Sequence, residues 1–314
     1  MRTRIVVGLI TFATAISGGD AGPSGCCGCS EHSSGRCGPA RGLGHDGKPL
    51  VQRDHRLPER PLHQFARRDV RVCDQRLGDH PPECPELRGA TSGLPLAVLP
   101  PKDCTSCKQA GPDLFTQGET WRAYQESMTI PCQQNMSADG LYVVRHNPPH
   151  YFLDIPAADC LAYDLPYPAL AADLANHTLP AYSFITPNLV NDMHTGTTDA
   201  VKVQTGDNWL ANNLPPLLNS PEYLTGSMVI FVMWDEGLGG RLLKGADCTT
   251  STDNSCHVPL LVISPYGTPA IAPTTQVNHY SVLKATEDLL GLPELGQATT
   301  APDLRADYGL TPTP

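Results

Sequence analysis

Three short apolar segments predict strands of a central sheet. Ala181–Thr186 (AYSFIT) is rich in β-forming residues and closes at Pro187. Met228–Trp234 (MVIFVMW) is continuously apolar, which is typical of a strand buried on both faces. Val258–Ser264 (VPLLVIS) has the same character and stops at Pro265.

Two segments show helical periodicity. Asp207–Ser220 begins with a capping Asp and places four leucines on one stripe, while Pro215 and Pro216 shorten or kink it. Ser281–Leu290 begins with a capping Ser, carries apolar residues at helical spacing and ends at Gly291. Strands that alternate with helices predict a layered α/β fold with a largely parallel sheet.

The N-terminal segment has the layout of a secretory signal peptide. Arg2 and Arg4 precede an apolar run, and small residues follow up to Gly19. We therefore expect residues 1–19 to be a signal peptide and the mature protein to be secreted. The alternative is a short buried strand or helix at the N-terminus.

The composition of the chain argues against two classes of protein, nucleic-acid binders and membrane-spanning proteins. The chain has 314 residues and a formal net charge of −10, so a basic nucleic-acid binder is not expected. No apolar run of about 20 residues follows the N-terminus, so the mature chain is expected to lack a transmembrane segment. The oligomeric state is left open.

Residues 36–89 differ in composition from the rest of the chain. They hold ten of the sixteen arginines, whereas all ten Tyr and all three Trp lie after residue 120. This aperiodic segment, rich in Arg, Gly, Pro and His, is typical of disorder.

The cysteines of the second part point to disulfides. Six follow residue 90, and an even number in an exported chain favours disulfide bonding. Cys248 and Cys256 bracket a polar loop, and we expect them to pair. Cys104 and Cys107 form a C-x-x-C that suits a disulfide better than a zinc half-site or a redox pair. The pairing among these two, Cys132 and Cys160 stays open.

In open α/β sheets the chemistry lies beyond the carboxyl ends of the strands. Asp235 and Glu236 leave the apolar strand into a glycine-rich loop. Hard divalent cations prefer such oxygen ligands, although a solvated acidic pair at a strand end is an equally good interpretation.

The loop after Thr186 holds a second set of polar groups. Asn191, Asp192 and His194 offer an amide, a carboxylate and an imidazole, which suit phosphate binding or protonation of a leaving group. Taken alone, the loop is more often a turn than a site. His279, directly before the last predicted helix, is another imidazole that by itself suits a structural role.

Seven motifs occur in order and together resemble one family, the bacterial phosphoesterases that include secreted acid phosphatases and phospholipases C of the alkaline phosphatase superfamily. The resemblance covers residues of about 91–305 and rests on TWRAYQESM (120–128), RHNPPHYF (145–152), FITPNLVNDMH (184–194), GDNWL (206–210), FVMWDEG (231–237), VPLLVISP (258–265) and NHYSVLKATEDLLGLP (278–293).

The resemblance implies a doubly wound α/β fold and metal-dependent attack of a hydroxyl nucleophile on a phosphate ester. Asp235 and Glu236 match metal ligands. Asn191, Asp192 and His194 match phosphate-side groups, and His279 is a weaker catalytic candidate. The family usually has Asp where this chain has Thr195, which weakens the match on the leaving-group side.

The family also has an N-terminal strand similar to HVVxxxMENHSY, which supplies a Glu–Asn metal pair, and a loop similar to HPSxPNY, whose Ser is the nucleophile. Neither occurs as written. With GC-rich codons, a frame shifted forward by one base allows MMENHSY at 45–52, HVVWV just before it, APYINSLA at 60–68 and THPSVPNY at 80–88. Our hypothesis is that residues from about 38 to 89 are a frame-shifted translation of the catalytic N-terminal part; the alternative is a genuine Cys- and Arg-rich linker.

The sequence thus predicts a signal peptide (1–19), a low-complexity segment (20–89) and a phosphoesterase domain (90–314). We expect an acid phosphatase acting on phosphate monoesters, with phosphoinositides or other lipid phosphates as one substrate class and a divalent metal ion as cofactor. The alternatives are a phospholipase C-type phosphodiesterase and a non-catalytic secreted remnant or binding protein. If the shift is real, we expect low turnover and low stability, because the sheet would lose a central strand.

Overall fold

The computed structural model describes residues 3–10, 69–71, 90–93, 110–235, 257–266 and 275–310. All of them belong to one compact unit, Met1–Ile16 together with Pro61–Pro314. In chain order, the elements are β1 (Arg4–Ile10), β2 (Asp69–Arg71), η2 (Leu114–Thr116), β3 (Trp121–Gln125), η3 (Val144–His146), η4 (Pro148–Tyr151), α2 (Ala157–Tyr163), β4 (Asp164–Pro166), α3 (Ala169–Asn176), β5 (Tyr182–Thr186), α4 (Asp199–Leu218), α5 (Pro221–Leu224), β6 (Met228–Trp234), β7 (His257–Ile263), α6 (His279–Leu290), η6 (Gly296–Thr300) and α7 (Arg305–Tyr308).

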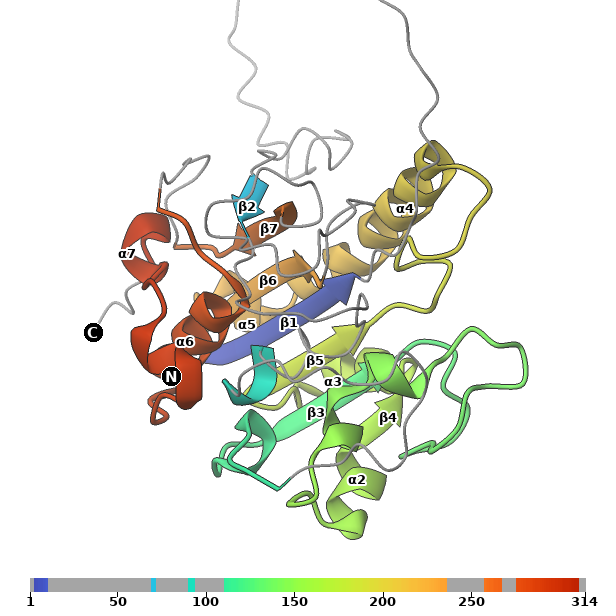
Figure 1. Ribbon diagram of the computed structural model, residues 1–314, viewed down its shortest axis with the longest axis horizontal. Helices are drawn as coiled ribbons and strands as arrows, with labels where there is room; N and C mark the ends of the chain where they lie inside the picture. Colours follow the sequence, from blue (N-terminus) through green and yellow to red (C-terminus); the bar gives the residue numbers. More distant parts are fainter. Residues whose placement is uncertain are drawn as a thin grey trace, which may run out of the picture. The chain divides into compact units, whose positions relative to one another are not determined.

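The described strands form one mixed sheet in the order β2-β7-β6-β1-β5-β3-β4 (Figure 1). From β6 to β4, neighbouring strands are parallel. β7 runs antiparallel to β6, and β2 antiparallel to β7. The expected α/β fold with a mostly parallel sheet is confirmed.

Two of the three predicted strands have the expected character. β6 has the predicted bounds and is buried along its whole length, and β5 is also fully buried. β7 differs, because it lies on the antiparallel side of the sheet, where Pro259 is exposed and Leu261, Val262 and Ile263 are only partly buried. The expectation of burial on both faces is therefore wrong for β7.

The N-terminal segment forms the central strand β1, which lies between β5 and β6 (Figure 1, blue). Its register pairs Ile5 with both Tyr182 and Val229. The buried-strand alternative is thus what the structure shows, and the signal peptide stays a prediction. The expected loss of a central strand is wrong for this structure, since β1 makes the sheet continuous there.

Alternating side chains of β1 enter two hydrophobic layers. Ile5 and Val7 pack with Val282 and Leu283 of α6 on one face of the sheet. Val6 packs on the other face with leucines of α4, such as Leu214. Helices therefore cover both faces, and the fold is doubly wound.

The predicted start of the long helix is wrong by eight residues. α4 begins at Asp199 because Thr198 caps it, its Oγ1 accepting a hydrogen bond from Val201 N at 3.3 Å. Val201 is 47% exposed, so the first turns of α4 lack the stripe of buried apolar residues from which a helix is predicted. Pro215 and Pro216 lie inside the helix and do not end it.

The last long helix begins two residues earlier than predicted. Asn278 caps α6 through a reciprocal capping box with Ser281, the residue predicted as the cap. The helix ends at Leu290 as predicted, and Gly291 follows with φ 73°, the left-handed conformation that glycine favours.

One disulfide lies in the described part of the chain. It joins Cys132 to Cys160, one of the pairings that the sequence left open. Cys104, Cys107, Cys248 and Cys256 lie outside the described residues. No described helix has both the length and the apolar character needed to cross a membrane.

Candidate functional site

Polar residues directly follow three parallel strands, at one edge of the sheet. Glu126 follows β3, the loop 187–194 follows β5, and Asp235 follows β6. β3, β5 and β6 share one direction, so their carboxyl ends meet at this edge. Since β1 separates β5 from β6, the ends of these two strands lie about 10 Å apart, two interstrand spacings.

The loop after β5 is folded by its own asparagine. Asn188 Oδ1 accepts hydrogen bonds from Val190 N and Asn191 N, both at 3.0 Å. This local turn is a known property of Asn side chains. Asn188 Nδ2 also donates to Ser127 Oγ at 3.0 Å, which ties the loop to the residues after β3.

Glu126 anchors the same loop. Its carboxylate accepts from Asn188 N at 2.8 Å and from Asn191 Nδ2 at 2.9 and 3.0 Å. The amide hydrogens of Asn191, which we expected to bind phosphate oxygens, therefore contact a carboxylate. Asn191 acts in this structure as a link between two strand ends.

Asp192 is completely buried and joins two motifs. Its Oδ2 lies 3.4 Å from His146 Nδ1, and its Oδ1 accepts from His194 N at 2.8 Å. The side chain of His146 is only 3% exposed. Thr186 Oγ1 donates to the carbonyl of His146 at 3.3 Å, so β5 fixes the position of η3.

His194 is the partly exposed member of this group. Its ring lies 6.5 Å from the ring of His146, centroid to centroid, in an edge-to-face arrangement. Its Nδ1 lies 3.3 Å from Thr195 Oγ1. The hydroxyl of Thr195 thus lies beside the ring of His194.

Met193 holds the loop against α4. It has φ 73°, a left-handed conformation that is uncommon for a non-glycine residue, and its side chain is buried. A Cβ on Gly206 would lie 2.1 Å from Met193 Cε and 2.5 Å from its Cγ. The glycine of the GDNWL motif is therefore required for the close approach of α4 to the loop.

Asp235 directly follows β6 and is completely buried, whereas Glu236 lies outside the described residues. His279 donates its Nε2 hydrogen to the carbonyl of Trp234 at 2.8 Å. Burial lowers the pKa of His279 to about 4, so its ring is neutral near pH 7. The hydrogen bond from His279 holds the end of the strand that Asp235 follows. A catalytic role of His279 stays a prediction.

Of the two predicted metal ligands, only Asp235 lies in the described part of the chain, where it offers the oxygens of a buried carboxylate. Oxygen ligands such as Asp235 are those that Mg²⁺, Ca²⁺ and Mn²⁺ prefer. Zn²⁺ also accepts carboxylate oxygens, so this donor alone does not select the metal.

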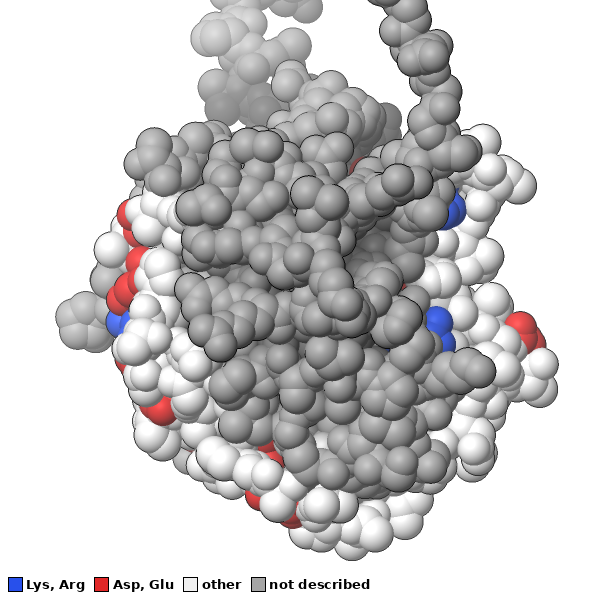
Figure 2. Space-filling view, in the orientation of Figure 1, with Lys and Arg blue, Asp and Glu red and all other residues white. Residues whose placement is uncertain are grey.

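In Figure 2, the Lys and Arg side chains of the described residues lie in small, separate groups, and acidic side chains lie at the left, lower and right edges of the view.

Sequence reasoning did not assign roles to Glu126 and His146. Both lie in motifs that carried the family resemblance, TWRAYQESM and RHNPPHYF. Glu126 also carried a local signal, because it directly follows a β-rich segment. His146 gave no local signal, since its partner Asp192 is 46 residues away in the chain.

The fold and the site define a class: α/β proteins whose polar groups are delivered by strand-end loops to one edge of a parallel sheet. Residues 100–293 match the model of the Phosphoesterase family, and the chain belongs to this family. The predicted family is thereby confirmed.

Curated relatives are named as phosphatases. A phosphatidylinositol-3-phosphatase from Mycobacterium tuberculosis is 29% identical over 199 residues, covering 63% of this chain and 58% of that protein. A phosphate-repressible acid phosphatase from Penicillium chrysogenum is 29% identical over 207 residues, 59% of this chain and 43% of that protein. An acid phosphatase from Aspergillus niger is 32% identical over 193 residues, 59% of this chain and 42% of that protein. This chain therefore spans about half the length of these relatives.

A solved structure is also similar. It is a protein of the alkaline phosphatase superfamily from Vibrio parahaemolyticus, with 14% sequence identity and a TM-score of 0.45, covering 76% of this chain and 63% of that chain.

Proposed function

We propose that this protein is a secreted, metal-dependent phosphoesterase of the acid phosphatase type, which hydrolyses phosphate monoesters. The observation that carries the proposal is the buried His146–Asp192 pair beside the partly exposed His194, at the sheet edge where Asp235 follows β6. Family membership and the names of the relatives support the reaction class.

His194 is proposed as the proton donor to the leaving-group oxygen. Its backbone is held by Asp192, and its ring is exposed enough to reach a bound ester. His146 and Asp192 position it, as do Glu126 and Asn191, which fix the loop from the other side. General acid catalysis by a positioned imidazole contributes typically about 10²–10⁴-fold.

Asp235 and Glu236 are proposed to hold a divalent cation. When bound, such a cation neutralises phosphate oxygens and activates a nearby nucleophile. In this chain, burial around Asp235 and the hydrogen bond from His279 to the strand end keep the carboxylate in place.

The hydroxyl nucleophile and the Glu–Asn metal pair are proposed to be encoded out of frame between about residues 38 and 89. Apart from the short strand β2, this segment lies outside the described residues. Because loss of a nucleophile costs many orders of magnitude in rate, we propose that the chain as written turns over negligibly.

Two experiments test this function. The nucleotide sequence across codons 20–95, together with peptides from residues 40–85, decides between an altered frame and a genuine linker. A gene with the frame restored is then expressed, and inorganic phosphate release from p-nitrophenyl phosphate is measured with and without a chelator. We expect activity only in the frame-restored protein, and loss of it on chelation and in the variant Asp235→Asn. Full activity of Asp235→Asn would show that the metal assignment is wrong.

A lipid phosphate is a second substrate class, favoured by the relative named phosphatidylinositol-3-phosphatase. Vesicles that contain phosphatidylinositol 3-phosphate test it. Release of inorganic phosphate would support a phosphomonoesterase, and release of diacylglycerol would support a phospholipase C-type reaction. Release of neither product by a folded, frame-restored protein would support a non-catalytic binding protein.

A further inference from the structure

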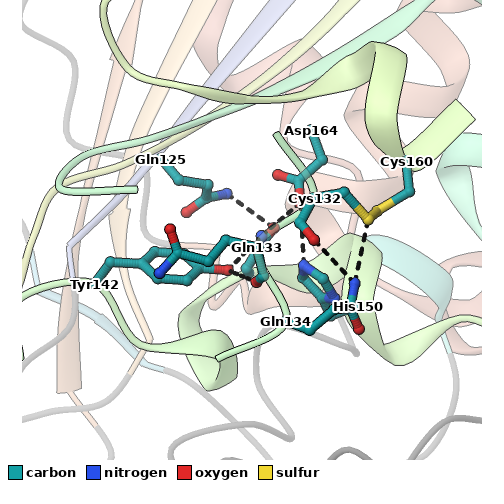
Figure 3. The surroundings of a disulfide bond; sticks show 9 residues. Gln125, Cys132, Gln133, Gln134, Tyr142, His150, Cys160 and Asp164 are labelled. Carbon is teal, nitrogen blue, oxygen red and sulfur yellow. Dashed lines mark hydrogen bonds and ion pairs between the residues drawn. A yellow bond between two sulfur atoms is a disulfide. The ribbon is translucent and has the colours of Figure 1, made fainter. Parts of the chain in front are cut away.

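A cluster of side chains of the types that ligate metals lies around the disulfide, away from Asp235 in the chain. Cys132, His150, Cys160 and Asp164 each offer one ligand atom, and these four atoms lie within 4.8 Å of one another. Figure 3 shows His150 and Asp164 beside the Cys132–Cys160 bond.

The imidazole and the carboxylate of this cluster already face each other. His150 Nε2 lies 3.1 Å from Asp164 Oδ2, and the two side chains are 2% and 0% exposed. Asn147 Nδ2 donates to the same Oδ2 at 2.8 Å. Among the described residues, the buried Oδ1 of Asp164 has no hydrogen-bond partner.

Separate elements bring the four residues together. His150 lies in η4, Cys160 in α2 and Asp164 at the start of β4. Cys132 precedes them in a loop, where its N donates to the carbonyl of Asp164 at 2.9 Å. Cys132 has φ 54°, a left-handed conformation that surrounding structure must maintain in a non-glycine residue.

The ligand types match those of a closed zinc site. Tetrahedral Zn²⁺ binds thiolate sulfur at about 2.3 Å and imidazole nitrogen or carboxylate oxygen at about 2.0–2.2 Å. These bond lengths place two sulfurs of one tetrahedron about 3.8 Å apart. The span of the present ligand atoms is of that order once the bond between the two sulfurs is open.

We propose that reduction of the Cys132–Cys160 disulfide converts this cluster into a Zn²⁺ site formed by two thiolates, His150 and Asp164. A dithiol reductant supplies two electrons and two protons, so that the S–S bond breaks, two thiols form and the reductant becomes a disulfide. Binding of Zn²⁺ then displaces one proton from each thiol. In the oxidised chain Cys132 and Cys160 are linked by the disulfide, and in the reduced chain they are linked through the bound Zn²⁺.

The cluster is connected to the candidate phosphoesterase site. Asn147, which bonds Asp164, also accepts a hydrogen bond from Gln125 Nε2 at 3.0 Å and directly follows His146. The state of the cluster therefore acts on the segment that holds His146 against Asp192. The reduced, metal-free chain is expected to lose order in this segment, and Zn²⁺ is expected to restore it.

The full-length chain is reduced with a dithiol, freed of the reductant under argon and titrated with Co²⁺ as a spectroscopic probe. We expect thiolate-to-cobalt charge-transfer absorption together with the d–d bands of tetrahedral Co²⁺. Addition of equimolar Zn²⁺ is expected to abolish both signals and to raise the melting temperature of the reduced chain. The oxidised chain is expected to show none of these signals. The absence of thiolate–cobalt absorption from the reduced chain would overturn the proposal.

Other cysteines are excluded by matched variants. Cys104→Ser with Cys107→Ser removes the C-x-x-C pair at positions 104 and 107 and is expected to leave the cobalt spectrum unchanged. His150→Gln is expected to weaken Co²⁺ binding by at least about 10-fold, as losses in a metal site commonly do. Far-UV circular dichroism checks that each variant is folded. A cobalt spectrum that survives in Cys132→Ser with Cys160→Ser, or that disappears in Cys104→Ser with Cys107→Ser, would assign the metal elsewhere.

Discussion

Nδ1 of His146 lies 3.4 Å from Oδ2 of Asp192, and both side chains are buried beneath the partly exposed ring of His194. The two residues come from different motifs, one before α2 and one after β5. A buried carboxylate against an imidazole fixes the orientation of the ring and stabilises positive charge that develops near it.

In the frame-restored protein, Asp192→Asn keeps the shape of the side chain but removes its charge. We expect kcat to fall by about 10²–10⁴-fold, the range of general acid–base contributions, while KM changes little. Steady-state kinetics with p-nitrophenyl phosphate measure both constants. Asp139→Asn, the same change in an exposed turn, is the control. A normal kcat in Asp192→Asn would show that the pair has no part in the reaction.

The contact between Gly206 and Met193 predicts an effect on stability. A Cβ at position 206 would overlap the buried side chain of Met193, so Gly206→Ala overpacks the interface between α4 and the loop. After the gain in helix propensity, we expect a loss of about 1–2 kcal/mol in the free energy of unfolding. Chemical denaturation of the chain as written measures this quantity.

Gly8 provides the matched control for this prediction. A Cβ there would meet only the carbonyl oxygen of Phe231, at an ordinary 3.9 Å. Gly8→Ala is therefore expected to leave the free energy of unfolding unchanged or to raise it by about 0.4–1 kcal/mol. An equal loss in both variants would contradict the role of the Met193 contact.

Glu287 predicts a dependence of stability on pH. Its carboxyl is completely buried in α6 and accepts from Leu295 N at 3.2 Å, and burial raises its pKa to about 8. The Glu287 carboxyl stays protonated in the folded state at pH values at which it has already ionised in the unfolded chain. Its contribution to stability is therefore complete below about pH 4.5 and is lost as the pH rises to about 8. We expect Glu287→Gln to remove this loss when melting temperature is measured against pH.

Asp113 is a second buried carboxyl that makes stability depend on pH, but over a lower pH range than Glu287. Burial raises the pKa of Asp113 to about 6, so its stabilising proton is lost by about pH 6, whereas Glu287 keeps its proton up to about pH 8. Asp113→Asn is expected to change the profile below about pH 6 and to leave the slope between pH 6 and 8 unchanged. If Glu287→Gln melts with the same slope as the unmodified chain between pH 6 and 8, Glu287 is already ionised there.

Val7 tests whether the N-terminal segment is a strand of the folded protein. It is 3% exposed in the layer between the sheet and α6, so Val7→Asp buries a carboxylate without a partner. We expect this variant to lose several kcal/mol of stability or to fail to fold, as unpaired buried charges do. The measurement uses chain expressed in the cytoplasm, where all residues are retained.

An exposed valine supplies the control. Val203 is 42% exposed on α4, and Val203→Asp is expected to change stability by no more than about 0.5 kcal/mol. If instead residues 1–19 are removed on export, intact mass will show it, and Val7→Asp will leave the exported protein as stable as before. A cleaved leader and a central strand are exclusive roles for the same residues.

Much of the sheet was readable from local pattern. Met228–Trp234 is buried throughout, and its uninterrupted apolar run marked both of its ends. Gly291 likewise marked the end of α6. The start of α4 was hidden, because its first turns face solvent and Thr198, rather than the predicted Asp207, caps it.

The sequence specified which segments are apolar enough to be buried, which residues begin or end helices, and which motifs belong to the family, because each of these is written in neighbouring residues. The tertiary structure decided that β1 lies between β5 and β6, that β7 runs antiparallel to β6, and that Glu126 contacts Asn191. It also decided that Cys132 forms a disulfide with Cys160 and that the carboxylate of Asp192 lies against the ring of His146. Such pairings join residues far apart in the chain, and they depend on strand order and direction, which no local pattern of apolar and polar residues contains.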